Sequence, residues 1–201
     1  MADLEIGTAI RPFRNISHCG DRIAYWREEK RTTLCVVDGL GHGIFAQRAA
    51  EAAIEYVGDH LSLPLPELFA GCDAEIRATR GVAMGISVID EQASTLTYAG
   101  VGNTRLIIAR KETNGPAEQR EVHCLMSDYG IVGGGYSKLT PETLPLFQGD
   151  WVLMFTDGIR ELIDLWSYDE GLLSDAQGLA GRILEDWGRI TDDAAVLVLR
   201  R

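Results

Sequence analysis

The hydrophobic and polar positions of the chain follow two periods, and the shorter one predicts strands. About nine short runs are rich in β-branched and aromatic residues, and they cover residues 4–10, 21–28, 32–37, 81–90, 94–99, 104–111, 120–126, 150–155 and 194–199. Since the gaps between the runs from 81 to 111 are short, we expect antiparallel hairpins there.

Three segments follow the helical period instead. In the first segment, residues 44–60, Ala49, Ala53 and Val57 fall on one stripe of a helix, which Leu61 continues just beyond the segment. Pro66 suits the first turn of a second helix that continues to about residue 79, and a third helix is expected over 174–187. An antiparallel meander with two helices inserted mid-chain and one late favours an α+β layered sandwich over Rossmann-type alternation.

Length and composition agree with an ordinary globular domain. With 201 residues, 46% hydrophobic and 24% charged, we expect one catalytic domain that spans residues 1–201. The formal net charge of −11 argues against binding to nucleic acid or to an anionic membrane, because both need clustered Lys and Arg. Most of this charge is expected on a solvated surface, and a carboxylate-rich cation site would add to it.

Cysteine usage and the absence of long apolar runs predict a cytoplasmic protein. The cysteines form no CxxC pair and no zinc spacing, so reduced, mostly buried thiols are expected. The opening MADLEIGTAIRP lacks the basic and apolar segments of a signal peptide. No apolar run approaches the ~18 residues of a membrane span.

Aspartates gather at the ends of the predicted strands. Asp38 and Asp157 each end a strand and are followed by glycine. Asp21 begins an early strand, while Asp192 and Asp193 directly precede the last one. A single Asp-Gly pair is common turn chemistry. Several strand ends of this kind indicate instead that the ends converge on one place.

Converging carboxylates predict a divalent cation. They repel one another unless they are protonated or neutralised, and oxygen ligands without thiolate or histidine favour Mg²⁺ or Mn²⁺ over zinc. A glycine after a liganding aspartate, as at Gly39, lets the backbone carbonyl reach the ion as well. Two ions sharing a bridging aspartate would hold a water between them, lower its pKa and direct it at phosphorus.

Three motifs carry a family resemblance. VVDGLGHG, FTDGI and TDDAAVLVL occur in the order and at the distances found in PPM-type metal-dependent serine/threonine protein phosphatases, which the chain resembles over nearly its whole length. DGLGHG is similar to the bacterial SpoIIE/RsbU branch. YAGVGNTRLIIAR resembles that branch's AGH strand and turn, with Val-Gly-Asn where a histidine is common. With no sensor domain and only a short stretch between Asp157 and Asp192, the chain looks most like stressosome phosphatases of the RsbX type.

The resemblance implies a fold and a set of metal ligands. The fold would be a layered sandwich of two mainly antiparallel β-sheets flanked by α-helices. Asp38 would bridge two ions, and Gly39 would offer its carbonyl. Asp157 and Asp192 would complete one metal site. Asp21 matches the early acidic position that reaches a metal, and a glycine precedes it where eukaryotic relatives carry a second acidic residue, so the outer ion is expected to bind more loosely.

Other positions are expected to assist. Asp193 would support the ligands. His42 would either protonate the leaving oxygen or cap the following helix, and Leu40 stands where the eukaryotic pattern has a histidine. Arg11 and Arg14 are candidates for phosphate contact, since an early arginine in the family contacts phosphate.

The implied activity is hydrolysis of phosphoserine or phosphothreonine with Mn²⁺ or Mg²⁺, through two ions. The implied partners are phosphorylated STAS-domain scaffold proteins of the RsbR/RsbS type. One alternative is a phosphatase-fold module that only binds a partner. Another is a GHKL-type ATP-binding kinase, but Gly39-Leu40-Gly41 after Asp38 does not match its Asp-x-Gly-x-Gly motif. The glycine-rich GIVGGG lacks P-loop spacing and is expected to be a loop between sheet elements.

Overall fold

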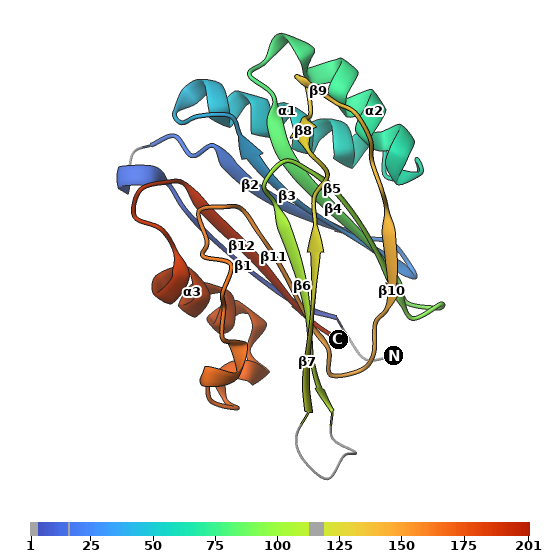
Figure 1. Ribbon diagram of the computed structural model, residues 1–201, viewed down its shortest axis with the longest axis vertical. Coiled ribbons are helices and arrows are strands. Elements are labelled where there is room, and N and C mark those ends of the chain that lie inside the picture. The colour runs from blue at the N-terminus through green and yellow to red at the C-terminus, as the bar shows by residue number, and fades with distance from the viewer. Residues whose placement is uncertain (1–3, 16, 113–118) are drawn as a thin grey trace.

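The computed structural model describes residues 4–15, 17–112 and 119–201, and it places two β-sheets face to face (Figure 1). The first sheet has the order β1 (Glu5–Arg11), β12 (Ala194–Arg200), β11 (Trp151–Phe155), β6 (Arg105–Glu112) and β7 (Gln119–Met126). The second has the order β10 (Glu142–Pro145), β5 (Thr95–Val101), β4 (Val82–Asp90), β3 (Arg31–Gly39) and β2 (Asp21–Arg27). Each pair within these two sheets is antiparallel.

Helices cover the outer side of each sheet. The α-helices are α1 (Ile44–Asp59), α2 (Leu65–Glu75) and α3 (Ala176–Trp187). Short 3₁₀ turns lie at Phe13–Asn15, Ile76–Ala78, Leu165–Ser167 and Leu172–Ser174. Helices α1 and α2 lie over the β2–β5 side, and α3 lies over β1 and β12 (Figure 1). The predicted α+β sandwich of two mainly antiparallel sheets is confirmed.

The order of the strands differs from the expected meander. β1 pairs along its whole length with β12, the last strand, and not with β2. β11 pairs with β12 on one side and with β6 on the other. The sequence analysis also missed β10 and the hairpin of β8 (Gly130–Ile131) and β9 (Gly135–Tyr136), which the GIVGGG segment forms. These strands are too short to carry a periodic signal.

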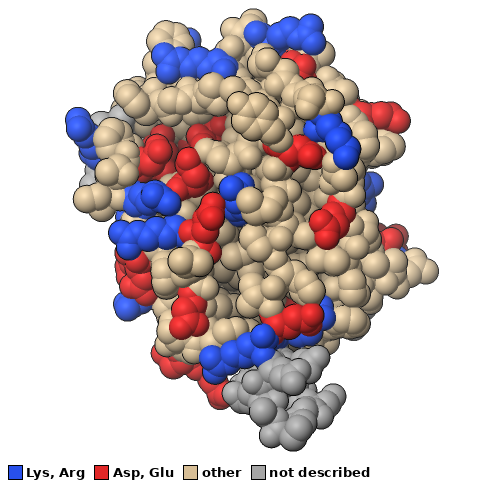
Figure 2. Space-filling view, in the orientation of Figure 1, with Lys and Arg blue, Asp and Glu red and all other residues tan. Residues whose placement is uncertain are grey.

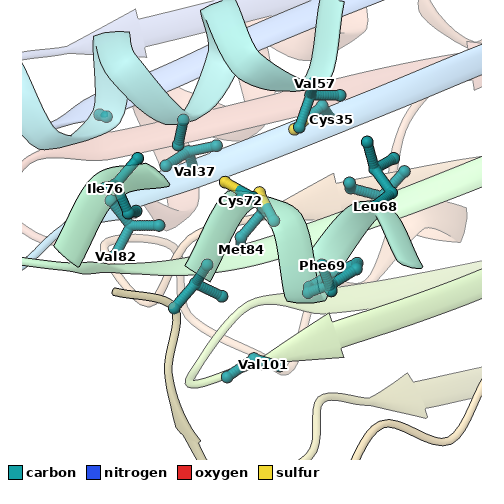
Figure 3. Packing of buried hydrophobic residues seen from close by; sticks show 14 of the residues in the cluster. Cys35, Val37, Val57, Leu68, Phe69, Cys72, Ile76, Val82, Met84 and Val101 are labelled. Atoms are coloured by element: carbon teal, nitrogen blue, oxygen red, sulfur yellow. The ribbon is translucent and has the colours of Figure 1, made fainter. Parts of the chain in front are cut away.

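The apolar core has three layers because the central strands are buried on both faces. Along β3, Leu34 and Val36 belong to the cluster between the two sheets, whereas Cys35 and Val37 pack toward α1 and α2. Figure 3 shows the layer between this sheet and helices α1 and α2, where Val57 and Phe69 of the helices meet the side chains of the sheet. Alternation of side chains across a strand produces this division. It also explains why β3 reads as a continuous apolar run in the sequence.

The cysteines are reduced as predicted, but they are not all buried. All four cysteines are free; Cys35 and Cys72 are buried, Cys19 is half-buried and Cys124 is exposed. Burial is therefore less general than expected. In the described part of the chain, no helix combines the length and the apolar character that a membrane crossing requires.

Candidate metal centre

The ends of β2 and β3 bring the first two aspartates together. Asp21 and Asp38 are register partners across this antiparallel pair. Like charges directly opposite each other in a sheet are destabilising. Asp21 is 1% exposed, and the hydroxyl of Thr156 donates to its Oδ2 at 2.6 Å. The fold thus places two carboxylates side by side at a largely buried strand end.

The other sheet delivers the remaining aspartates. Asp157 follows the end of β11, and Asp192 precedes the start of β12. The Asn103 amide joins the two sheets, because its Nδ2 lies 2.7 Å from Oδ2 of Asp157 and 3.4 Å from Oδ2 of Asp38. The predicted convergence of strand ends is therefore present in the structure.

Asp21, Asp38 and Asp192 have raised pKa values. Burial, followed by the charges of Asp157 and Asp192, raises the pKa of Asp38 from 3.8 to about 7. Burial and then the charge of Asp38 hold the pKa of Asp21 well above its ordinary value, although the Thr156 hydrogen bond opposes this shift. Burial and then Asp157 also raise the pKa of Asp192. In each case burial is the largest cause and the charge of neighbouring aspartates adds to it.

The donor set fits a hard divalent cation. Among the described residues, no Lys or Arg forms an ion pair with any of four carboxylates: Asp21, Asp38, Asp157 and Asp192. The amide oxygen of Asn103 is buried and unpartnered, so one neutral oxygen is also available there. Carboxylate and amide oxygens suit Mg²⁺ and Mn²⁺.

The carboxylates are not preset as a closed cage. Within residues 4–15, 17–112 and 119–201, no three His, Cys, Asp or Glu side chains are already arranged as a ligand set for one ion. Mg²⁺ is commonly held by one or two carboxylates and completed by water. The arrangement therefore suits an ion that is bound by few protein ligands. It also suits an ion whose binding requires the carboxylate side chains to rotate.

Gly39 has a packing reason of its own. It is buried, and a Cβ at this position would lie 2.1 Å from the carbonyl oxygen of Ala46 in α1. Its backbone N–H donates to the carbonyl of Gly20 at 3.1 Å. The end of β3 can approach the first turn of α1 only with glycine at this position, which fixes the place of the neighbouring Asp38.

Asp193 stands apart from the other acids in its contacts. Its Oδ1 accepts from the backbone N–H of Phe13 at 2.7 Å, and its Oδ2 accepts from that of Gly20 at 2.8 Å. Both oxygens thus hold the loop that leads into β2. This agrees with the supporting role expected for Asp193.

His42 lies beside the centre and does not cap α1. The N-cap residue of α1 is Gly43, which makes no side-chain cap bond, so the capping alternative is wrong. The His42 ring is exposed, lies 6.1 Å from the Phe13 ring between centroids, and interacts electrostatically with Asp192. This position leaves His42 free to meet a substrate.

The two early arginines have different surroundings. Arg11 donates from Nη2 to the carbonyl of Arg189 at 2.7 Å, which engages it in the structure. Arg14 is exposed, has a φ of 53°, and holds its guanidinium 4.8 Å from the centroid of the Phe13 ring. Of the two, only Arg14 lies at the surface near the loop of His42.

Sequence reasoning missed Asn103 and Thr156 as members of this centre. Asn103 lies between β5 and β6, so it occupies the same kind of strand-end position as the aspartates. As a neutral amide, it lacks the charge that marks the aspartates as candidate ligands in the sequence. Thr156 precedes Asp157 within the quoted FTDGI motif, and no residue pattern pointed to its contact with Asp21.

A two-sheet sandwich with acids gathered at its strand ends defines a PPM-type, or PP2C-type, metal-dependent phosphatase. The sequence profile described as "Stage II sporulation protein E (SpoIIE)" matches residues 28–201. The chain belongs to this family of metal-dependent protein serine/threonine phosphatases. Fold and family together exclude the GHKL-kinase alternative.

Individual relatives agree with this assignment. The chain is 26% identical to the phosphoserine phosphatase RsbX of Bacillus subtilis (strain 168) over 144 residues, which are 72% of this chain and 69% of that protein. A solved structure described under the bacterial stressosome, "a modular system that has been adapted to control secondary messenger signaling", is 31% identical with a TM-score of 0.85. That match covers 98% of this chain and 100% of the other.

RsbX crystallised in complex with magnesium has the same fold. It matches with 20% identity and a TM-score of 0.78 over 99% of this chain and 96% of that one. The prediction of an RsbX-like member of the SpoIIE branch is confirmed. A divalent metal cofactor agrees with these relatives and with the donor set described above.

Proposed function

We propose that the chain hydrolyses phosphoserine or phosphothreonine on a folded STAS-domain protein of the RsbR/RsbS type and so resets a bacterial stress-signalling pathway in the cytoplasm. The carboxylate centre supplies the chemistry for this reaction. The likeness to RsbX and to a stressosome protein supports the choice of partner.

The observation that carries the proposal is the unneutralised pair of Asp21 and Asp38. They face each other across β2 and β3. Burial and then the charge of Asp38 raise the pKa of Asp21, and burial and then the charge of Asp157 raise the pKa of Asp38. Asp38 would be the ligand shared by two divalent ions, and Gly39 would offer its carbonyl. Asp157 and Asp192 would hold one ion, and Asp21 would reach the other.

Divalent ions bound here would supply an activated water nucleophile and offset the charge of the phosphoryl oxygens. The protein residues prepare this site. The side-chain amide of Asn103 donates to both Asp157 and Asp38, and the hydroxyl of Thr156 orients the carboxylate of Asp21. His42, exposed beside Asp192, would donate a proton to the leaving serine or threonine oxygen.

Metal-dependent phosphate release tests the chemistry. A phosphorylated STAS-domain protein is incubated with Mn²⁺, with Mg²⁺ and with excess chelator, and inorganic phosphate is measured. Both metals are expected to support release, chelation to abolish it, and added Mn²⁺ to restore it. Full release in excess chelator would contradict the proposal. Calorimetric titration of Mn²⁺ then separates a chain that binds no metal from one that binds it without turnover.

The choice of a folded partner needs a second comparison. Phosphate contacts alone do not distinguish one phosphoprotein from another, so discrimination has to come from surfaces around the site. We expect a much higher kcat/KM for the folded phosphoprotein than for the short phosphopeptide cut from it, with phosphotyrosine a poor substrate. Equal values for protein and peptide would show that recognition lies in the local sequence.

A further inference from the structure

A cavity of about 350 Å³ opens directly beside the carboxylate centre. It shares Asp38 and Asn103 with that centre. Apolar side chains form much of the remaining lining: Leu40, Ala83, Tyr129 and Ile131. A substrate that brings a phosphoryl group to Asp38 must therefore lie across or next to this cavity.

The mouth of the cavity exposes large apolar side chains. Tyr129 is 94% exposed, and Leu40 is 37% exposed. Isolated exposed apolar residues are ordinary, but these two border a cavity next to the reacting centre. Figure 2 shows the face that carries β6 and β7, where acidic and basic side chains are interspersed around an area without either. With a net charge of −11, short-range apolar contact is a better source of selectivity for an acidic phosphoprotein than long-range attraction.

The cavity wall is held in place by the backbone. Asp128 donates its N–H to the carbonyl of Gly100 at 2.8 Å and accepts from the N–H of Gly102 at 2.9 Å. Val82 and Val132 exchange two backbone hydrogen bonds of 2.9 Å. The segment before and within the β8–β9 hairpin is thus fixed to β4 and β5. The glycine-rich segment serves as the wall of a preformed cavity, not as a phosphate loop.

One cation lines the same cavity. The Arg105 side chain is 16% exposed, and its Nη1 donates to the carbonyl of Thr104 at 3.0 Å. Its Nη2 lies 3.3 Å from a carboxylate oxygen of Glu161, and its Nε is buried without a partner. Charge and apolar surface therefore occur together beside Asp38, which complements a phosphorylated segment with an apolar neighbour.

We propose that this cavity binds an apolar side chain next to the phosphorylated serine or threonine of the substrate protein. The inference rests on the proposed phosphatase function. With the phosphoryl group over the carboxylates, an adjacent residue lies about 3.3–3.6 Å further along an extended chain, which suits a cavity that also includes Asp38. Leu40, Tyr129 and Ile131 then contact the apolar side chain. This local contact adds to whatever surfaces a folded partner supplies.

Matched phosphopeptides test the cavity. One peptide set places a single leucine at each position adjacent to phosphoserine, and the reference peptide has serine at those positions. The ratio of kcat/KM between the best leucine peptide and the reference is measured for the wild type, Tyr129→Ser and Tyr25→Ser. Tyr25 lies on the edge strand β2 and is 47% exposed, so its substitution is the control for the same chemical change.

The wild-type ratio is expected to be about 10, at the lower end of what a hydrophobic pocket discriminates. Tyr129→Ser should bring the ratio toward one, mainly through KM, and Tyr25→Ser should retain the wild-type ratio. A wild-type ratio near one, or an unchanged ratio in Tyr129→Ser, overturns the inference.

Hydrolysis of para-nitrophenyl phosphate by the wild type with Mn²⁺ reports the phosphatase function separately. If that hydrolysis is absent, the proposed function fails. The same peptide comparison is then read as a ratio of Kd values by fluorescence anisotropy. A preference for leucine that depends on Tyr129 still supports the cavity, and no preference overturns it.

Discussion

The acids at the two ends of β11 differ in burial and in partner: Asp150 is buried beside a cation, whereas Asp157 is exposed and accepts from a neutral amide. Asp150, just before the strand, is 0% exposed and accepts two hydrogen bonds of 2.9 Å from Arg110, which raises the pKa of that arginine. Asp157, just after the strand, lies in one group with Asp38 and Asp21. The neutral amide of Asn103 donates to Asp157 and Asp38, and the neutral hydroxyl of Thr156 donates to Asp21. The first acid is neutralised by the protein itself. The second group retains charge that an added cation can neutralise.

The largest effect should follow from replacing Asp38, the proposed bridging ligand. Asp38→Asn is expected to lower kcat with Mn²⁺ on the order of 1,000-fold, the size of loss seen when a main electrostatic group of an active site is removed. Stability of the metal-free protein should be kept or improved, because one repulsive charge is gone. Turnover and urea unfolding are measured on the same variant. Near-normal turnover in Asp38→Asn with loss in Asp157→Asn would assign the bridge to Asp157 instead.

Replacing Asp150, the acid paired with Arg110, should have the reverse effect: stability should fall and turnover should be kept. Asp150→Asn leaves Arg110 without its buried partner, and we expect the free energy of unfolding to fall by about 3 kcal/mol. Metal-dependent turnover of the folded fraction should stay close to the wild type, because Asp150 lies at the far end of β11 from the centre. Urea unfolding and kcat below the transition test both parts. A loss of turnover without a loss of stability would contradict the contrast between the two ends.

A smaller effect should follow from replacing His42, the proposed proton donor. His42→Gln is expected to lower kcat about 100-fold for a phosphoserine substrate, whose leaving alkoxide needs a proton. The loss should be much smaller with para-nitrophenyl phosphate, since nitrophenolate leaves without one. Measuring both substrates side by side separates proton donation from damage to the centre. Equal losses on the two substrates would place His42 in binding or positioning.

The smallest effect concerns pH in the metal-free protein. The folded pKa of Asp38 is about 7, against 3.8 as its ordinary value, so folding favours the protonated acid. Stability is therefore highest below about pH 4 as far as this group is concerned, and it is lost as the pH rises from about 4 to 7. With Mn²⁺ the slope should reverse, because metal binding requires ionised carboxylates. Thermal unfolding at pH 5 and pH 8, with chelator and with Mn²⁺, checks the sign of both slopes.

The sequence allowed most elements to be placed because their patterns are local. The stripe from Ala49 to Val57 predicts α1, and the apolar run before Asp38 predicts β3. The pairing of β1 with β12 could not be read in this way, since it depends on contacts between the two ends of the chain. Two-residue strands such as β8 likewise leave no period to detect.

The site was predicted as far as its residues are acidic. Aspartates at the ends of the predicted strands indicate the cluster in the sequence. The two neutral donors, Asn103 and Thr156, are evident only from the structure. Asn103 follows the end of β5 much as the acids follow their strands, so a search that included amides would have included it. The cavity could not have been predicted, because Leu40, Ala83 and Tyr129 are brought together only by the approach of three loops and strand ends.

The position of β12 between β1 and β11 has a consequence for synthesis of the protein. On the ribosome, β1 and β11 emerge first, and both lack their shared neighbour until residues 194–200 follow. Asp21 and Asp192 come from opposite ends of the described chain, so a nascent chain cannot yet unite them. The protein should therefore be inert during translation and gain its cation-binding centre only in the last step of folding, which long-range pairing makes slow.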